Sequence, residues 1–198
     1  MEKGVRLAVI IAAGLLIACN PNGDDPKAQL ESMYDSDQAY RTQMQEVIAA
    51  EGVSSMSFYV LWAKQAFNDW SNVRKLDRLI DERGWPSRSV VGEKGATAAF
   101  LVIQHASLDR QKKYQPLLQA AAAKGEAPAD QLALLEDRIL MREGRKQKYG
   151  SQLQMNDQDA WEFYPIENEP GVDERRKAVG LPPLADYAKE LGVAYHAP

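Results

Sequence analysis

The sequence predicts a mainly α-helical protein, a single multi-helix domain with a small C-terminal β-hairpin. Apolar residues recur with the period of an α-helix along five stretches between residues 30 and 143. Glycines and prolines separate these stretches, as expected for helices joined by turns. Beyond residue 150 the pattern changes to two short arms around the turn-like Asn156–Asp159, which favours a hairpin near residues 151–166.

The first two expected helices are the longest. One runs from about Leu30 to Ala50 and ends at Gly52, and the other runs from about Ser57 to Arg83 and ends at Gly84. Glycine directly after a helix favours its end, and Pro86 prevents the second helix from continuing. The apolar stripe of the second helix is expected to face inward and consists of Phe58, Leu61, Trp62, Ala66, Trp70, Val73, Leu76, Leu79 and Ile80.

The next three helices are expected over residues 95–106, 109–124 and 128–143. The first of them is apolar on all sides, which is typical of a helix at the centre of a domain. Pro116 falls inside the second and is expected to kink it or to split it in two. Gly144 ends the third.

Two short helices are expected after the hairpin, near Val172–Val179 and Leu184–Leu191, with Gly180 and Pro182–Pro183 between them. An isolated hairpin has marginal stability in water, so this one is expected to pack on the helices. Residues 29–198 are therefore expected to form one domain.

The N-terminus has the features of a bacterial lipoprotein signal peptide. Lys3 and Arg6 precede an apolar run that is too short to cross a bilayer as a helix, and Leu16–Ala18 leads directly to Cys19, the only cysteine. This arrangement resembles a lipobox, in which Cys19 is lipidated after removal of residues 1–18. The alternative is an ordinary secretory signal that ends in a chance cysteine.

A lipid on Cys19 would tether the protein to a membrane of the cell envelope through the proline- and glycine-containing segment 19–28. Asn20 favours the outer membrane, on its periplasmic face, if the organism is Gram-negative. The net charge of −4 argues against nucleic acid as a partner. With its only cysteine lipidated the chain has no disulfide, so the fold depends on its core.

His105 is the main candidate for chemistry. It ends the apolar third helix, beside Gln104 and shortly before Asp109. A histidine that is oriented by a carboxylate can act as a general acid or base. The alternative is a structural histidine that forms hydrogen bonds between helices in the core.

A second group of charged residues lies in the middle of the fifth expected helix, among its apolar positions: Glu136, Asp137 and Arg138. Charged residues are rarely buried unless they are paired. Asp137 and Arg138 are therefore expected either to contact His105 or the hairpin, or to form an internal network that fixes helix packing. Another charged pair, Asp37 with Arg41 four residues later in the first helix, is expected to be structural.

The segment between the fifth helix and the hairpin carries amide, phenol and hydroxyl groups around Gly150, which permits close approach of the backbone. Gln147, Tyr149 and Gln152 are therefore candidate ligand-binding residues. The alternative, equally well supported by the sequence, is that the segment caps the fifth helix and starts the hairpin.

Several catalytic and metal-binding patterns are absent from the sequence. It has no His-Glu-x-x-His, no cysteine cluster, no glycine-rich phosphate loop and no Gly-x-Ser-x-Gly elbow, and it contains only two histidines. No metal ligands are assigned, and no cofactor is expected.

Several short motifs together resemble a bacterial domain family of unknown function. They are Gly84-Trp85-Pro86, Gln104-His105-Ala106, Asp137-Arg138 and Gln147-x-Tyr149-Gly150-Ser151-Gln152, with Asp37-Gln38 and Arg41. Ser151 stands where members of the family usually have threonine, and both keep a hydroxyl. The resemblance covers roughly residues 30–191. It implies a helical domain whose polar motif residues can converge, and it implies no known reaction.

Two classes of function fit these observations. The favoured one is a membrane-anchored envelope lipoprotein that binds a partner protein or a small polar ligand. Its candidate contacts are Gln104, Arg138, Gln147, Tyr149 and Gln152. The alternative is a hydrolase- or lyase-type enzyme in which His105 is the general acid or base and Asp109 or Asp137 orients it, with Arg138, Gln147 and Tyr149 as substrate contacts.

Overall fold

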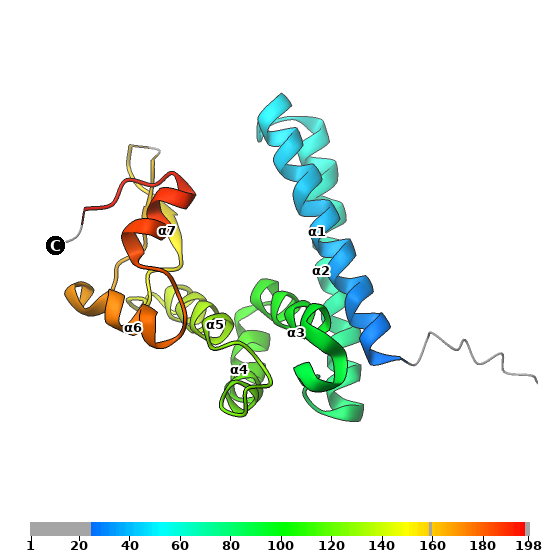
Figure 1. Ribbon diagram of the computed structural model, residues 1–198. Coiled ribbons are helices and arrows are strands. Elements are labelled where there is room, and N and C mark those ends of the chain that lie inside the picture. Colours follow the sequence, from blue (N-terminus) through cyan, green and yellow to red (C-terminus); the bar gives the residue numbers. More distant parts are fainter. Residues whose placement is uncertain (1–24, 159, 197–198) are drawn as a thin grey trace, which may run out of the picture.

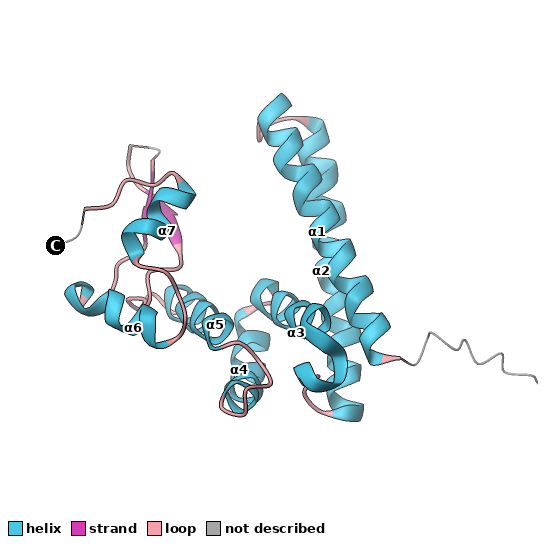
Figure 2. Ribbon diagram, viewed as in Figure 1, coloured by secondary structure: helices cyan, strands magenta, loops and turns pink. Residues whose placement is uncertain are grey.

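The computed structural model describes residues 25–158 and 160–196. The expected signal peptide, Cys19 and most of the expected tether lie outside the described residues. In the described part of the chain helices dominate, and two strands form one antiparallel pair near the C-terminus (Figure 2). The predicted fold class is confirmed. Within these ranges no helix is both long and apolar enough to span a bilayer.

The two longest helices, α1 (Pro26–Glu51) and α2 (Met56–Arg83), form an antiparallel hairpin (Figure 1). α1 starts at Pro26 because the carboxylate of Asp25 accepts a hydrogen bond from the amide of Lys27, and proline suits the first turn of a helix. The helix therefore takes in the last residues of the expected tether. Ser55 caps α2 in a similar way, by accepting a hydrogen bond from the amide of Phe58.

Helix α3 (Arg88–His105) packs against the hairpin near the end at which α1 begins (Figure 1). It starts earlier than residue 95, and its regular geometry is interrupted at Gly92, which has a φ of 75°. Ala98 and Ala99 are fully buried, so the central position expected for this helix is confirmed. Their small side chains allow α1 to approach closely.

Helix α4 (Leu108–Ala122) continues through Pro116 without a break, so the expected splitting does not occur. Because proline has no N–H, the carbonyl of Lys112 loses its helical hydrogen bond. Both Pro116 and Lys112 lie on the exposed side of α4, where this carbonyl can bond to water instead. Helix α5 (Ala129–Arg142) packs antiparallel to α4 and leads into the C-terminal part of the chain.

The C-terminal part contains the strands β1 (Leu153–Met155) and β2 (Trp161–Phe163), in which Gln154 pairs with Glu162. A short 3₁₀ turn and the helices α6 (Val172–Ala178) and α7 (Leu184–Leu191) follow. The bounds of these elements agree closely with those expected from the sequence.

The described residues form two apolar cores. The larger one joins residues of helices α1 to α5, and the smaller one consists of Ile166, Val172 and Leu184 with the partly buried Phe163, Tyr187 and Tyr195 around it. The hairpin contributes Phe163 to the smaller core, so it packs on α7 rather than on the long helices.

The expected inward stripe of α2 needs correction. Trp62 and Trp70 are 59% and 55% exposed, because α2 buries a different face against α1, with Gln65, Asn72 and Leu76 on it. Large apolar side chains instead follow the outer side of the helix: Met56, Tyr59, Val60, Trp62, Phe67 and Trp70. Helix α3 reaches only the lower part of the α1–α2 hairpin, so nothing in the described chain covers this side (Figure 1).

Candidate functional site

A cluster of polar side chains lies where the end of α3 meets the α1–α2 hairpin. Asp37 and Arg41 come from one face of α1, Gln65 and Asp69 from one face of α2, and His105 is the last residue of α3. In each helical pair the two residues are four apart, so both project from the same side. We call these five residues the His105 cluster.

Arg41 lies at the centre of the cluster. Its Nε and Nη2 donate to the carboxylate of Asp37 at 2.9–3.0 Å, and Nη2 lies 2.7 Å from Nδ1 of His105. The same Nη2 is 3.5 Å from the carboxylate of Asp69. Gln65 joins the two carboxylates, because its Nε2 donates to Asp69 at 2.7 Å and to Asp37 at 3.3 Å. Three helices are thus connected by one polar network.

The contact with Arg41 determines the tautomer of His105. A guanidinium has donors only, so Nδ1 of His105 must accept, and the proton of the neutral imidazole lies on Nε2. Nδ1 is also 3.6 Å from Oδ1 of Asp37, so a protonated ring would find a carboxylate beside it. His105 is therefore held by side chains from another helix, and its Nε2 remains able to donate to a bound molecule.

The two carboxylates of the cluster differ in their pKa values. Burial favours a higher pKa for Asp37, but its contacts with His105 and Arg41 outweigh burial and hold its pKa well below the usual range. Burial raises the pKa of Asp69, although Arg41 and Gln65 oppose this shift. Asp37 is therefore a fixed negative charge, whereas Asp69 takes up a proton more readily.

The cluster also contains the residue types of a metal site. One ligand atom from each of Asp37, Asp69 and His105 lies within 4.8 Å of the others. The guanidinium of Arg41 contacts all three side chains and already supplies a positive charge among them. A metal ion would have to displace Arg41. The three side chains therefore fit the guanidinium of Arg41 as their cation better than a metal ion.

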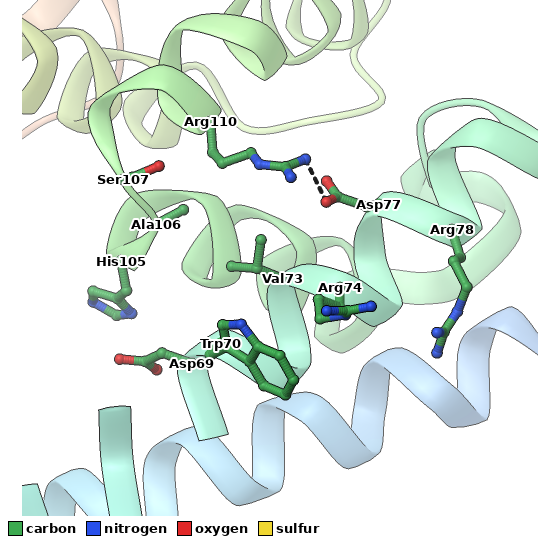
Figure 3. A pocket seen from close by; sticks show the side chains of 10 residues that line it. All are labelled: Asp69, Trp70, Val73, Arg74, Asp77, Arg78, His105, Ala106, Ser107 and Arg110. Atoms are coloured by element: carbon green, nitrogen blue, oxygen red, sulfur yellow. Dashed lines mark ion pairs between the residues drawn. The ribbon is translucent and has the colours of Figure 1, made fainter. Parts of the chain in front are cut away.

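A pocket of about 640 Å³ opens beside the cluster, between α2 and the junction of α3 with α4 (Figure 3). This volume is typical of small-molecule sites. Its lining residues are Asp69, Trp70, Val73, Arg74, Asp77, Arg78, His105, Ala106, Ser107 and Arg110. Arg110 forms an ion pair with Asp77 across it, and the guanidinium of Arg74 lies 4.9 Å from the centre of the Trp70 ring. We call this space the His105 pocket.

The residues expected to orient His105 lie elsewhere. Asp109 is exposed in the first turn of α4, and Asp137 forms its hydrogen bonds with a loop, so the neighbours of His105 are Asp37 and Arg41 instead. Gln104 is buried beside His105. Its carbonyl accepts from the side chain of Gln111 at 2.8 Å, and its Oε1 has no partner among the described residues.

Asp137 organises the loop that follows α5. Its buried carboxylate accepts from the amides of Lys148, Tyr149 and Ser151 at 2.7–3.0 Å and from the hydroxyl of Ser151 at 2.9 Å. Burial raises the pKa of Asp137, and these hydrogen bonds oppose the shift. Asp137 thus contacts the loop that leads into the hairpin, and none of these contacts is with His105 or is an ion pair.

Gln147 has a similar position in the same loop. It is fully buried, its Oε1 accepts from the amide of Gln152 at 2.9 Å, and its Nε2 donates to the carbonyls of Gln152 and Tyr164 at 3.0 and 2.6 Å. The carbonyl of Tyr149 accepts from Arg176 at 2.6 Å. These groups join the loop to the hairpin and to α6, and none of them lines the His105 pocket.

Arg138 and Gln152 line a second pocket, of about 480 Å³, between α5, the hairpin and α7. The structure therefore distributes the candidate residues over three places. His105 lies at the first pocket, Arg138 and Gln152 at the second, and Asp137, Gln147 and the backbone of Tyr149 in the loop.

Two residues of the cluster, Gln65 and Asp69, are not among the candidates identified from the sequence. A signal for them exists, because Gln65, Asp69 and Asn72 place polar groups at helical spacing between the apolar Leu61 and Leu76. Polar residues at such positions indicate that a neighbouring helix offers them partners.

The comparisons with known proteins give a family but no function. No curated protein and no solved structure matches the chain. Residues 24–197 match DUF6624, a family of unknown function. This range includes every helix and strand described above, and the chain therefore belongs to the DUF6624 family.

Proposed function

We propose that the protein is a lipid-anchored protein of the bacterial cell envelope whose helical domain binds a small polar ligand in the His105 pocket. The observation that carries the ligand site is the His105 cluster, a network of buried and partly buried polar side chains beside an open pocket. The anchor is supported by the sequence alone, through the lipobox that ends at Cys19.

The distance between the anchor and the domain supports this arrangement. Only the residues from Asn20 to Asp25 separate Cys19 from the first residue of α1. Six residues span at most about 20 Å. A lipid on Cys19 would therefore keep the domain close to the membrane surface.

Replacement of Cys19 tests the anchor. Expressed in a bacterium, the full chain is expected in the membrane fraction, with an N-terminal mass that includes acyl chains, and Cys19→Ser is expected to lose both. Ser54→Cys is a suitable control, because it restores one cysteine to the Cys19→Ser chain at an exposed position between α1 and α2. A Cys19→Ser chain that still partitions into the membrane with an unchanged N-terminus would contradict the anchor.

The chemistry of the His105 pocket favours a polar ligand with a flat face. The Trp70 ring offers a surface for stacking, Nε2 of His105 offers a donor, and Asp69 offers an acceptor. Arg74 and Arg78 add positive charge that no carboxylate among the described residues neutralises through an ion pair.

A thermal-shift screen with polar metabolites and envelope sugars tests this site, because a ligand that binds only the folded state must raise the melting temperature. The ligand found should lose at least about tenfold in affinity for His105→Asn and Trp70→Ala, about 1.4 kcal/mol or more. His196→Asn is the matched control, since His196 is the other histidine and is exposed near the C-terminus. Unchanged affinity in both pocket variants would rule out this pocket as the site.

The second candidate function is catalysis by His105, for which the sequence suggested a general acid or base role. It is favoured by one observation, a histidine that lines a pocket and is held by Arg41; because this contact puts the proton of the neutral ring on Nε2, the tautomer fits donation of a proton from Nε2 and not its removal there. Asp37 and Arg41 take the orienting role that the sequence suggested for Asp109 or Asp137.

Hydrolysis of nitrophenyl esters, phosphates and glycosides by the full chain tests catalysis. Turnover that His105→Asn abolishes and His196→Asn retains is the expected result for an enzyme. Absence of turnover with all three substrate classes, together with ligand binding in the thermal-shift screen, would favour the binding function alone.

A further inference from the structure

We propose that Arg138 forms the centre of a second ligand site, which binds a carboxylate or phosphate group carried on an apolar body. The site is the pocket between α5, the hairpin and α7, and it is separate from the His105 pocket. The proposal does not depend on the lipid anchor or on ligand binding at His105.

The pocket combines one cation with a mostly apolar wall. Its polar lining residues are Arg138, Ser151, Gln152 and Tyr187, and its apolar lining residues are Met141, Leu153, Trp161, Leu191 and Val193. Pockets with a few polar groups among apolar side chains are typical of sites for small organic ligands.

Arg138 lacks the partners that a buried guanidinium normally has. Its Nε is buried without a hydrogen-bond partner, and no carboxylate of the described residues forms an ion pair with it. By contrast, Arg41 pairs with Asp37, and Arg176 donates to two backbone carbonyls although its Nη2 has no partner among the described residues. No group of the described residues neutralises this charge, so the partly buried guanidinium is available to an anion that enters the pocket it lines.

Neighbouring charges make the region around Arg138 still more attractive to an anion. Burial, with the positive charges of Arg142 and Arg41, lowers the pKa of Arg138 to about 10. The side chain therefore remains charged at neutral pH. Arg142 donates to the carbonyl of Ala106 at 2.6 Å, which leaves its charge without a carboxylate to neutralise it.

The shape of the charged group selects the type of anion. A guanidinium presents parallel N–H donors that match the two oxygens of a carboxylate or phosphate. Tyr187 places a phenol at the same pocket, and burial raises the pKa of this phenol, so it stays protonated and can donate. Trp161 is 56% exposed at the pocket, where its ring can cover the apolar part of a ligand.

Calorimetric titration of the full chain in detergent tests the proposal with five probes at constant ionic strength. Phenylacetate and phenyl phosphate carry both features, acetate and inorganic phosphate carry only the charge, and benzyl alcohol carries only the ring. We expect one of the two aromatic anions to bind with at least tenfold higher affinity than its small counterpart, and benzyl alcohol not to bind. Which of the two binds more tightly distinguishes a carboxylate from a phosphate ligand.

Arg138→Met tests whether this guanidinium holds the anion. It retains the length of the side chain, and we expect at least a tenfold loss of affinity for the aromatic anion with no decrease of the melting temperature in buffer without it. Arg145→Gln is the matched control, because Arg145 is an exposed arginine just beyond α5, and its removal should leave binding unchanged.

Three outcomes would overturn the proposal. They are no saturable binding of either aromatic anion in the millimolar range, equal affinity in Arg138→Met, and equal losses in Arg138→Met and Arg145→Gln. If Arg138→Met does not fold, Arg138→Lys keeps the charge but loses the paired donors, and it must bind the anion more weakly than the unaltered chain. Binding that is lost in Trp70→Ala instead would assign the anion to the His105 pocket.

Discussion

Asp37 shows how one carboxylate can hold several elements of this fold together. It is 4% exposed and contacts Arg41 on its own helix, Gln65 on α2 and His105 on α3. The sequence indicates only the first of these contacts, because only Arg41 lies within the same helical face. The others depend on residues that are 28 and 68 positions away along the chain.

Asp37→Asn is expected to lower the free energy of unfolding by about 1–3 kcal/mol, since it removes the buried carboxylate that Arg41 and Gln65 contact and leaves the partly buried guanidinium with only the more distant Asp69. Because the pKa of Asp37 is held low, the stability it provides is present above about pH 4 and is lost as the pH falls further. In urea titrations from pH 7 to pH 3, the free energy of unfolding should therefore decrease less steeply at acidic pH for the variant than for the unaltered chain. Parallel curves for the two proteins would contradict this role of Asp37.

Asp137 has a comparable structural role in the C-terminal part of the chain. Asp137→Asn replaces one accepting oxygen by an amide donor that faces backbone N–H groups, so we expect a loss of about 2–4 kcal/mol in urea denaturation. Asp109→Asn is the control, because Asp109 is exposed and should change stability by less than about 0.5 kcal/mol. The hydroxyl of Ser151 also donates to Asp137, a contact that a threonine hydroxyl could make as well.

At the scale of elements, the loop from Gln147 to Gln152 joins α5 to the hairpin by close contact as well as by hydrogen bonds. Gly150 has a φ of 69°, and a Cβ atom there would lie 2.9 Å from the side chains of both Ile166 and Leu184. These two residues belong to the smaller core. Glycine is therefore required for both its backbone conformation and its lack of a side chain.

Gly150→Ala should lower the free energy of unfolding by about 2–4 kcal/mol, the sum of a left-handed backbone cost and overpacking. Gly125→Ala separates the two effects, because Gly125 has a similar φ of 71° but open space around it, and only about 1 kcal/mol is expected there. Equal losses in the two variants would show that crowding at Gly150 is unimportant.

At the scale of the whole molecule, two apolar cores share one chain, and polar contacts connect the parts of the smaller one. Arg176 is fully buried, donates to the carbonyls of Tyr149 and Pro182 at 2.6 Å, and lies 4.9 Å from the centre of the Tyr187 ring. It thereby joins α6 to α7 and to the loop that Asp137 holds.

Arg176→Met should loosen this part of the molecule without unfolding the long helices. In hydrogen exchange, amides of residues 147–193 are expected to lose at least tenfold in protection, while those of α1 and α3 remain protected. Lys177→Met, at an exposed neighbouring position, should leave both regions unchanged. A uniform loss of protection over the whole chain would show that the two cores unfold as one unit.

The sequence by itself determined the helical class, the hairpin and most of the helix ends, although α1 and α3 begin earlier than expected. Apolar periodicity and chain breakers such as Gly52, Gly84 and Pro182–Pro183 act over a few residues, and local interactions are sufficient to place the ends of an element. The short motifs likewise resembled a family of unknown function, and the match over residues 24–197 is consistent with a domain of unknown function.

Only the tertiary structure decided which polar residues meet. It places His105 beside Arg41 and Asp37 rather than Asp109 or Asp137, and it turns Trp62 and Trp70 outward. The physical reason is that periodicity gives the faces of a helix, whereas the way in which helices cross decides which face is covered and which distant side chains come within hydrogen-bond distance.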